Sequence, residues 1–93
     1  MIRQLHLFYF GRVQGVGFRY AVLQIAHQQK VCGWVMNLDN GQVEIMAYAE
    51  EEALNNLLQE INQQFSSYIK DLKIEWLPAC QPEGELSGFE IKF

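Results

Sequence analysis

The sequence predicts an α+β fold in which two helices pack on one face of an antiparallel sheet of four to five strands. Several segments alternate apolar and polar side chains with the period of a strand, and two segments between them carry apolar side chains at helical spacing. Their order along the chain is βαββαβ with one further strand. This order is typical of a split βαβ sandwich, with both helices on the same side of the sheet.

The first predicted strand, loop and helix occupy residues 3 to 30. Residues 3–10 are rich in aromatic and branched side chains, as strands are, but the alternation does not decide whether positions 5, 7 and 9 or positions 6, 8 and 10 face the core. Residues 11–17 (GRVQGVG) contain three glycines, which indicates a tight loop with unusual backbone angles. From Phe18 to about Lys30, apolar residues recur at helical spacing.

The second half of the predicted fold is a hairpin, a helix and two strands. Residues 32–38 and 42–49 form strands joined by a turn that contains Asn40-Gly41, a strong hairpin signal. Acidic residues 50–52 start the second helix, because negative charge favours a helix N-terminus. The apolar stripe of this helix consists of Leu54, Leu57, Leu58, Ile61 and Phe65. A strand at 69–77, a connection at 78–87 and a short final strand at 88–93 follow it.

Length, charge and cysteine spacing exclude several classes of protein. A chain of 93 residues is shorter than the roughly 150 of an average domain, so residues 1–93 are expected to form one domain. The net charge of −4 argues against nucleic acid or an anionic membrane surface as partner. The sequence shows neither a membrane span nor a signal peptide, so we expect a cytoplasmic protein. Cys32 and Cys80 lack metal-site or redox spacing and are expected to be free, buried thiols.

The glycine-rich loop is the first candidate for a functional site. A loop of this kind can turn several backbone N–H groups toward one point, and the helix that follows adds the positive end of its dipole. Arg19 lies in the first turn of that helix, where its planar guanidinium could bind phosphate oxygens, and Arg12 lies in the loop itself. These features indicate a phosphate site. The alternative is a structural turn followed by a solvated arginine.

Asn37 is the second candidate, because asparagine is depleted in strands and this one ends an apolar strand. Its amide can hold a water by donating one hydrogen bond and accepting another, provided that it lies near the loop. The alternative is that it bonds the local backbone of the following turn. His6, His27 and the acidic residues 50–52 are weaker candidates, since the histidines are far apart in sequence and helix-end electrostatics explains the acids.

Two segments carry a family resemblance. GRVQGVGFR at 11–19 and GWVMNLDNG at 33–41 resemble the two signature segments of acylphosphatases, and the similarity in pattern covers essentially the whole chain. It implies a ferredoxin-like α/β sandwich and a monomeric, metal-independent hydrolase without cofactor. Leu38 departs from the family pattern, in which a small hydroxyl residue often follows the asparagine. The implied phosphate-binding residues are Arg12, Val13, Gln14, Gly15, Val16, Gly17 and Arg19, and Asn37 would orient the attacking water.

The implied reaction is hydrolysis of a small-molecule acyl phosphate to a carboxylate and inorganic phosphate. A carboxylate leaves readily, because its conjugate acid has a pKa of about 4, so little help from a general acid is needed. Positioning of the water and stabilisation of phosphoryl charge would then account for catalysis. One rival is a non-catalytic module that binds phosphate or carbamoyl phosphate within a larger carbamoyl-transferring protein. An RNA-binding module of the same topology is disfavoured, because QVEIMAYA at 42–49 contains no basic residue.

Overall fold

The computed structural model describes residues 2–78 and 88–93, and all seven predicted elements lie within one or two residues of their expected positions. Most of the predicted connection at 78–87, with Cys80, lies outside the described residues. Neither helix in the described ranges is long and apolar enough to cross a membrane. The elements are β1 (Arg3–Gly11), α1 (Phe18–Gln29), β2 (Cys32–Asn37), β3 (Val43–Ala49), α2 (Glu51–Gln64), β4 (Ile69–Leu77) and β5 (Phe89–Lys92).

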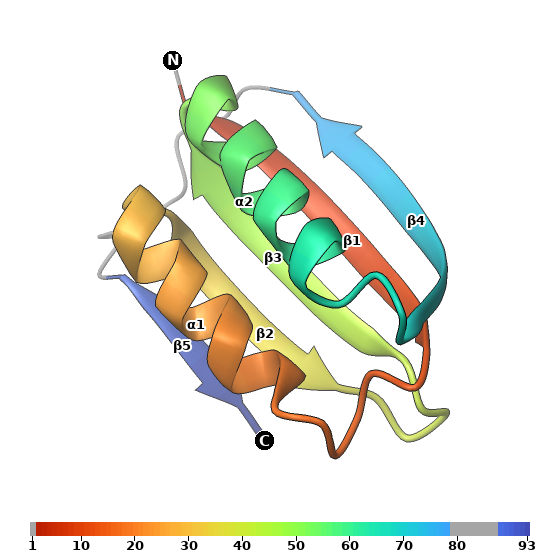
Figure 1. The fold of residues 1–93 in the computed structure, drawn as a ribbon. Helices are drawn as coiled ribbons and strands as arrows, with labels where there is room; N and C mark the ends of the chain where they lie inside the picture. The colour runs from red at the N-terminus through yellow and green to blue at the C-terminus, as the bar shows by residue number, and fades with distance from the viewer. Residues whose placement is uncertain (1, 79–87) are drawn as a thin grey trace.

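The sheet has five strands in the order β4-β1-β3-β2-β5, and both helices lie across one of its faces (Figure 1). The two-layer sandwich is therefore confirmed. The sheet differs from the prediction in one respect: it is mixed, because β5 pairs with β2 in parallel while every other pair is antiparallel. The reason is topological, since β4 ends at the same end of the sheet at which β2 and β5 begin.

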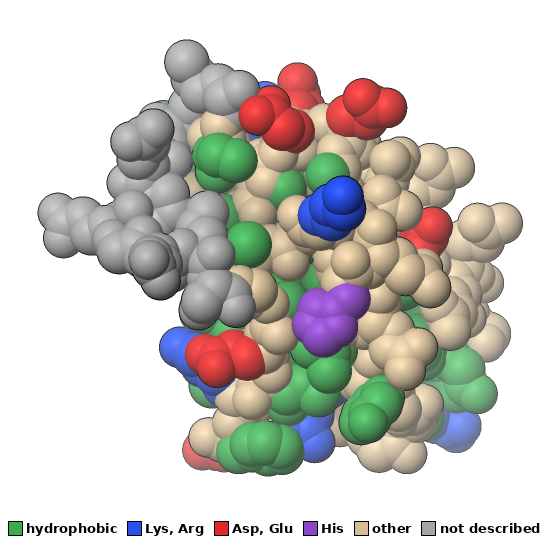
Figure 2. Space-filling model, turned by 90° about the vertical axis from the view of Figure 1, so that its left-hand side faces the viewer, with side chains coloured by type: hydrophobic (Ala, Val, Ile, Leu, Met, Phe, Trp, Pro, Cys, Tyr) green, Lys and Arg blue, Asp and Glu red, His purple; other side chains and the backbone are tan. Residues whose placement is uncertain are grey.

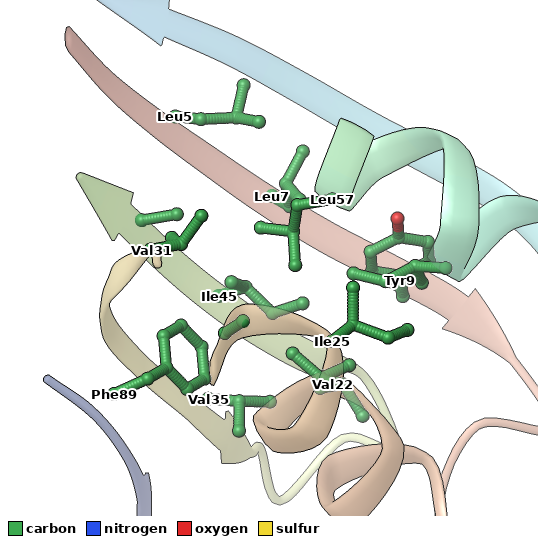
Figure 3. Packing of buried hydrophobic residues seen from close by; sticks show 14 of the residues in the cluster. Leu5, Leu7, Tyr9, Val22, Ile25, Val31, Val35, Ile45, Leu57 and Phe89 are labelled. Carbon is green, nitrogen blue, oxygen red and sulfur yellow. The ribbon is translucent and has the colours of Figure 1, made fainter. Parts of the chain in front are cut away.

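The core lies between the helices and the sheet, and it settles which face of β1 is buried. Leu5, Leu7 and Tyr9 are completely buried, so positions 5, 7 and 9 face the helices (Figure 3). The predicted stripe of α2 faces the same core, although its Leu58 is only half-buried. In α1 the buried side chains are Phe18, Val22, Ile25 and Ala26. This packing sets the first turn of α1 beside the end of β2, where the candidate residues lie (Figure 1).

Tyr9 brings a polar group into this core, and its hydroxyl donates a hydrogen bond of 2.8 Å to Asn62 Oδ1. Burial raises the pKa of Tyr9 well above the ordinary tyrosine value, because the charged phenolate is poorly solvated inside the protein. The folded protein therefore keeps this phenol neutral at a pH at which the unfolded chain ionises it.

Stability should consequently fall at alkaline pH through Tyr9. A raised pKa in the folded state stabilises the fold at every pH below the unfolded value of about 10, and this contribution is lost as pH rises past it. Tyr9→Phe should lower the free energy of unfolding by about 1 kcal/mol at neutral pH and flatten the decline above about pH 10. Urea unfolding at about pH 7 and about pH 11 measures both effects. An equally steep decline in Tyr9→Phe and in the exposed control Tyr68→Phe contradicts the prediction.

Candidate active site

A pocket of about 270 Å³ opens at the end of the sandwich where β1 leads into α1 and where β2 ends. It contains the two residues that sequence analysis favoured most, Arg19 and Asn37, together with three residues of the glycine-rich loop. Segments that are distant in sequence therefore meet at one site. The full lining is Val13, Gly15 and Gly17 from the loop, Phe18, Arg19 and Tyr20 from α1, Asn37 from β2, and Ile91 and Phe93 from β5 and the residue after it.

The loop owes its path to two glycines with left-handed backbone angles. Gly15 and Gly17 have φ angles of 77° and 80°, and a Cβ atom built on either would meet nothing within 4 Å. Backbone conformation, and not lack of space, is therefore what requires glycine here. Within the described residues, the N–H groups of residues 13–17 donate to no backbone carbonyl. The loop therefore has backbone N–H donors without backbone acceptors next to the N-terminus of α1.

The N-terminus of α1 differs from that of α2 in its electrostatics. Helix α2 has Glu51 and Glu52 in its first turn, which offset the positive end of its dipole. Helix α1 has no acidic residue in its first turn, and its N-cap, Gly17, makes no side-chain capping bond. The first N–H groups of α1 and its dipole therefore face the pocket without a negative partner from the helix itself. An anion is the natural partner of such a terminus.

Arg19 adds a full positive charge to this terminus. Its guanidinium lies over the ring of Phe93, with 5.1 Å between the guanidinium carbon and the ring centroid. No carboxylate pairs with Arg19 in the part of the chain that the structure describes. Its five N–H donors are consequently available to an anion in the pocket.

Asn37 contributes an amide whose oxygen has no partner. Its Oδ1 atom is buried and accepts no hydrogen bond from any described residue. Other residues make the hydrogen bonds of the following turn, which was the alternative role for Asn37: Leu38 N donates to Gln42 O at 2.8 Å, and Asn40 Oδ1 accepts a bond from Gln42 N. An unpaired buried oxygen destabilises a fold by about 1–3 kcal/mol and calls for an explanation such as a bound molecule. The terminal torsion of asparagine is soft, so a small rotation turns the amide toward a molecule in the pocket.

The side chain of Gln14 links the loop to the β2–β3 turn, a role that the sequence gave no reason to expect. Its Nε2 donates to Leu38 O at 2.8 Å and to Gln42 O at 2.9 Å. Leu38 directly follows Asn37, so these two bonds hold the loop and the asparagine in a fixed relation. A long polar side chain in a loop carries no local signal for such a contact, because its partners lie 24 and 28 residues further along the chain.

Removal of these bonds should destabilise the protein. Gln14→Glu keeps the size of the side chain, but a carboxylate cannot donate and would face two carbonyl oxygens. We expect the free energy of unfolding to fall by about 1–3 kcal/mol, and by about 1 kcal/mol in Gln14→Ala. Urea unfolding measures the loss, and faster amide exchange at Leu38 and Gly41, whose N–H groups are bonded within the β2–β3 turn, would locate it at this contact. The exposed Gln24→Glu is the matched control, and equal stability of the two glutamate variants contradicts the role assigned to Gln14.

Arg12 and Val16, two other residues of the predicted phosphate loop, do not line the pocket with their side chains. The backbone N–H of Arg12 donates to Tyr68 O at 2.9 Å, and its side chain lines a separate hollow with Ser67 and Lys70. Val16 is half-buried and packs against the core. The N–H of Arg12 is thus already engaged, which the glycine spacing alone did not reveal.

The weaker candidates are remote from the pocket. His6 lies on the uncovered face of the sheet with its Nε2 2.7 Å from Glu44 Oε2, and His27 is exposed on α1. Cys32 is free, but it is half-buried and not buried as expected. Across the ranges that the structure describes, no group of three His, Cys, Asp or Glu side chains is placed to hold a metal ion.

Comparisons with known proteins agree with the fold. The family model for acylphosphatase matches residues 5–91. The acylphosphatase of Bacillus licheniformis is 44% identical over 86% of this chain and 83% of its own length. That of Trichormus variabilis is 36% identical over 96% of this chain and 85% of its own length. That of Bacillus velezensis is 50% identical over 62% of this chain, a match that spans 64% of its own length.

Two solved structures are informative. The Bacillus subtilis acylphosphatase structure superposes with a TM-score of 0.86 at 37% identity, covering 100% of both chains, which confirms the ferredoxin-like sandwich. A structure of full-length HypF in its phosphate- and nucleotide-bound form matches 100% of this chain and 12% of that one, with a TM-score of 0.83 at 26% identity.

Proposed function

The chain belongs to the acylphosphatase family, whose members are enzymes that hydrolyse acyl phosphates, and on this basis we propose how its pocket catalyses the reaction. A water molecule attacks the phosphorus atom in line with the bond to the acyl oxygen. A phosphorus–oxygen bond to the water forms while the bond to the acyl oxygen breaks, and the carboxylate leaves with the electron pair of that bond. The products are a carboxylate and inorganic phosphate.

The phosphoryl group is held by the loop, the N-terminus of α1 and Arg19. Unpaired N–H groups of residues 13–17 and the uncapped helix end supply fixed partial positive charges, and Arg19 supplies a full one. Such donors stabilise the charge on the phosphoryl oxygens in the transition state without having to reorganise. The N–H of Arg12 is not one of these donors, because it already donates to Tyr68 O.

The attacking water is positioned by Asn37. The observation that carries this assignment is the buried Oδ1 without a partner, in a pocket that also contains Arg19. An amide of this kind can accept one bond from the water, and its Nδ2 can donate another, so it aligns the water without removing its proton. We assign the role of proton acceptor to an oxygen of the substrate's own phosphate.

The leaving group explains why the pocket works without a general acid. Among the described residues, the lining contains no carboxylate, imidazole or thiol side chain. A carboxylate with a conjugate-acid pKa of about 4 needs no protonation as it departs. The residues present, which position and stabilise charge, are therefore sufficient for this substrate class.

Hydrolysis of benzoyl phosphate in the presence of EDTA tests the proposal directly. We expect turnover of the purified protein, with a rate that does not change when EDTA is added or removed. A rate that EDTA abolishes and a divalent cation restores would refute the metal-independent mechanism. The assay follows the absorbance of the benzoyl group, with spontaneous hydrolysis of the substrate subtracted.

A second candidate is a non-catalytic module that binds phosphate or carbamoyl phosphate. The observation in its favour is the match of the whole chain to 12% of a HypF structure. The same assay separates the two functions. Saturable binding of inorganic phosphate without turnover of benzoyl phosphate or carbamoyl phosphate identifies the binding module, and turnover identifies the enzyme.

A further inference from the structure

The pocket has an apolar wall that binding of phosphate does not explain. The loop, Arg19 and Asn37 account for its polar lining. The remaining lining side chains that are not buried are those of Tyr20 and Phe93, which are exposed, and Ile91, which is half-buried; we call these three the acyl wall. Tyr20 and Phe93 are 65% and 100% exposed, the two highest values among the large hydrophobic side chains in the described ranges. Apolar side chains that are this exposed and gathered at one pocket indicate a binding surface.

The register of β5 places this wall next to the reacting groups. Val35 lies opposite Ile91 and Met36 opposite Lys92 in the parallel pair, so Phe93 follows at the level of Asn37. Ile91 and Phe93 share a face by alternation. Figure 2 shows hydrophobic side chains exposed at the lower end of this side of the molecule, close to Lys and Arg side chains.

The pocket is also larger than a phosphate group requires. A phosphate group has only five heavy atoms and fills only part of a volume of about 270 Å³. Phosphate bound by the loop and Arg19 occupies the polar part. The acyl group is attached to that phosphate through a single oxygen, so it must lie along the part of the pocket that the phosphate ligands leave free.

We propose that the acyl wall binds the acyl group and makes the enzyme selective for acyl phosphates with an aromatic or large apolar acyl group over those with a small one. This inference rests on the proposed function. An aromatic acyl group can stack on Tyr20 or Phe93, and apolar contact with Ile91 removes further surface from water. A methyl group, as in acetyl phosphate, makes few of these contacts. Each aromatic ring is expected to favour the aromatic substrate by about threefold to tenfold.

Phe93 also contacts Arg19, so the experiment must distinguish an effect on the acyl wall from an effect on the phosphate site. Its ring supports the Arg19 guanidinium, so Phe93→Ala can also disturb the phosphate site. That disturbance acts on every acyl phosphate alike. Tyr20 makes no such contact within the described residues, so Tyr20→Ala reports on the wall alone.

The experiment measures kcat/KM for benzoyl phosphate and for acetyl phosphate in each variant. The ratio of the two values, compared with the wild-type ratio, cancels the different reactivities of the substrates. We expect the ratio to fall threefold to tenfold in Tyr20→Ala and in Phe93→Ala, and by the product of the two effects, about ninefold to a hundredfold, in the double variant. It should not change in Tyr68→Ala, the matched control, whose aromatic side chain is exposed and outside this pocket.

An unchanged ratio in Tyr20→Ala overturns the proposal, even if Phe93→Ala lowers both rates. Should the wild-type protein hydrolyse neither substrate, the proposed function fails, and binding decides the inference instead. Phenylphosphonate and methylphosphonate carry the same anionic group and are not hydrolysed. Tighter binding of phenylphosphonate, with the difference lost in Tyr20→Ala, supports the acyl wall, and equal affinities refute it.

Discussion

Arg19→Ala should lower kcat/KM for benzoyl phosphate by about a hundredfold to a thousandfold. The substitution removes the full positive charge at the pocket and leaves only the partial charges of backbone N–H groups. Groups that stabilise developing charge in a site of this kind contribute about 3–4 kcal/mol, and about 1.4 kcal/mol corresponds to a factor of ten in rate. Both kcat and KM should change, because the same donors bind the phosphoryl group in the ground state and in the transition state. Steady-state kinetics with benzoyl phosphate measures the loss.

Two variants complete the experiment on Arg19. Arg19→Lys keeps the charge but not the planar fork, so its activity should lie between those of the wild type and Arg19→Ala. Arg3→Ala is the matched control, because Arg3 lies at the start of β1, where it pairs with Glu51. Turnover of Arg19→Ala within a few-fold of the control would refute the role of Arg19 in binding the phosphoryl group.

Asn37→Ala should lower kcat by about a hundredfold while inorganic phosphate still binds. The proposed partner of Asn37 is the attacking water, and the ligands of the phosphoryl group remain in place. Without Asn37 the attacking water is no longer held in line with the breaking bond, so part of the rate advantage of a fixed geometry is lost. The measurements are kcat with benzoyl phosphate and the inhibition constant of inorganic phosphate, with Asn40→Ala in the β2–β3 turn as matched control. A parallel loss of phosphate affinity would make Asn37 a phosphate ligand instead.

The same variant should be at least as stable as the wild type. Asn37→Ala removes a buried oxygen that has no partner, and with it a contribution that destabilises the fold. We therefore expect the free energy of unfolding to stay equal or to rise by about 1 kcal/mol, a pattern typical of residues retained for activity. A clear loss of stability would show that Asn37 has a structural role.

Local sequence pattern was sufficient to predict the helices, the strands and the hairpin turn, because each depends on an apolar period or a turn signal that the sequence displays directly. The apolar spacing of α2 and the Asn40-Gly41 hairpin turn are examples. The buried face of β1 was undecided, since aromatic residues occupy both faces and only packing against the helices selects Leu5, Leu7 and Tyr9. The parallel pairing of β5 depends on which edge of the sheet it joins, and alternation carries no information about that.

Part of the candidate site could likewise be predicted from the sequence, and part depends on tertiary contacts. Arg19 was found because it follows the glycine-rich loop in the first turn of a helix, and Asn37 because asparagine is rare in strands; the structure brings both to one pocket. The bonds of Gln14 and the engaged N–H of Arg12 were missed, since both depend on partners that only tertiary structure brings near. Tyr20 and Phe93 were missed because an exposed aromatic residue looks like any other surface or core residue until a pocket appears beside it.

The position of β1 in the sheet has a consequence for how the chain folds. This first strand has no neighbour that is close in sequence: Arg3 lies opposite Ala49 in β3, and Gln4 lies opposite Leu77 in β4. A long loop must therefore close, with its loss of chain entropy, before β1 gains any pairing, whereas β2 and β3 pair across a short turn. Proteins dominated by such distant contacts fold more slowly than helical proteins of similar length and stability. The strand order therefore limits the rate at which the active site forms, whatever the stability of the finished fold.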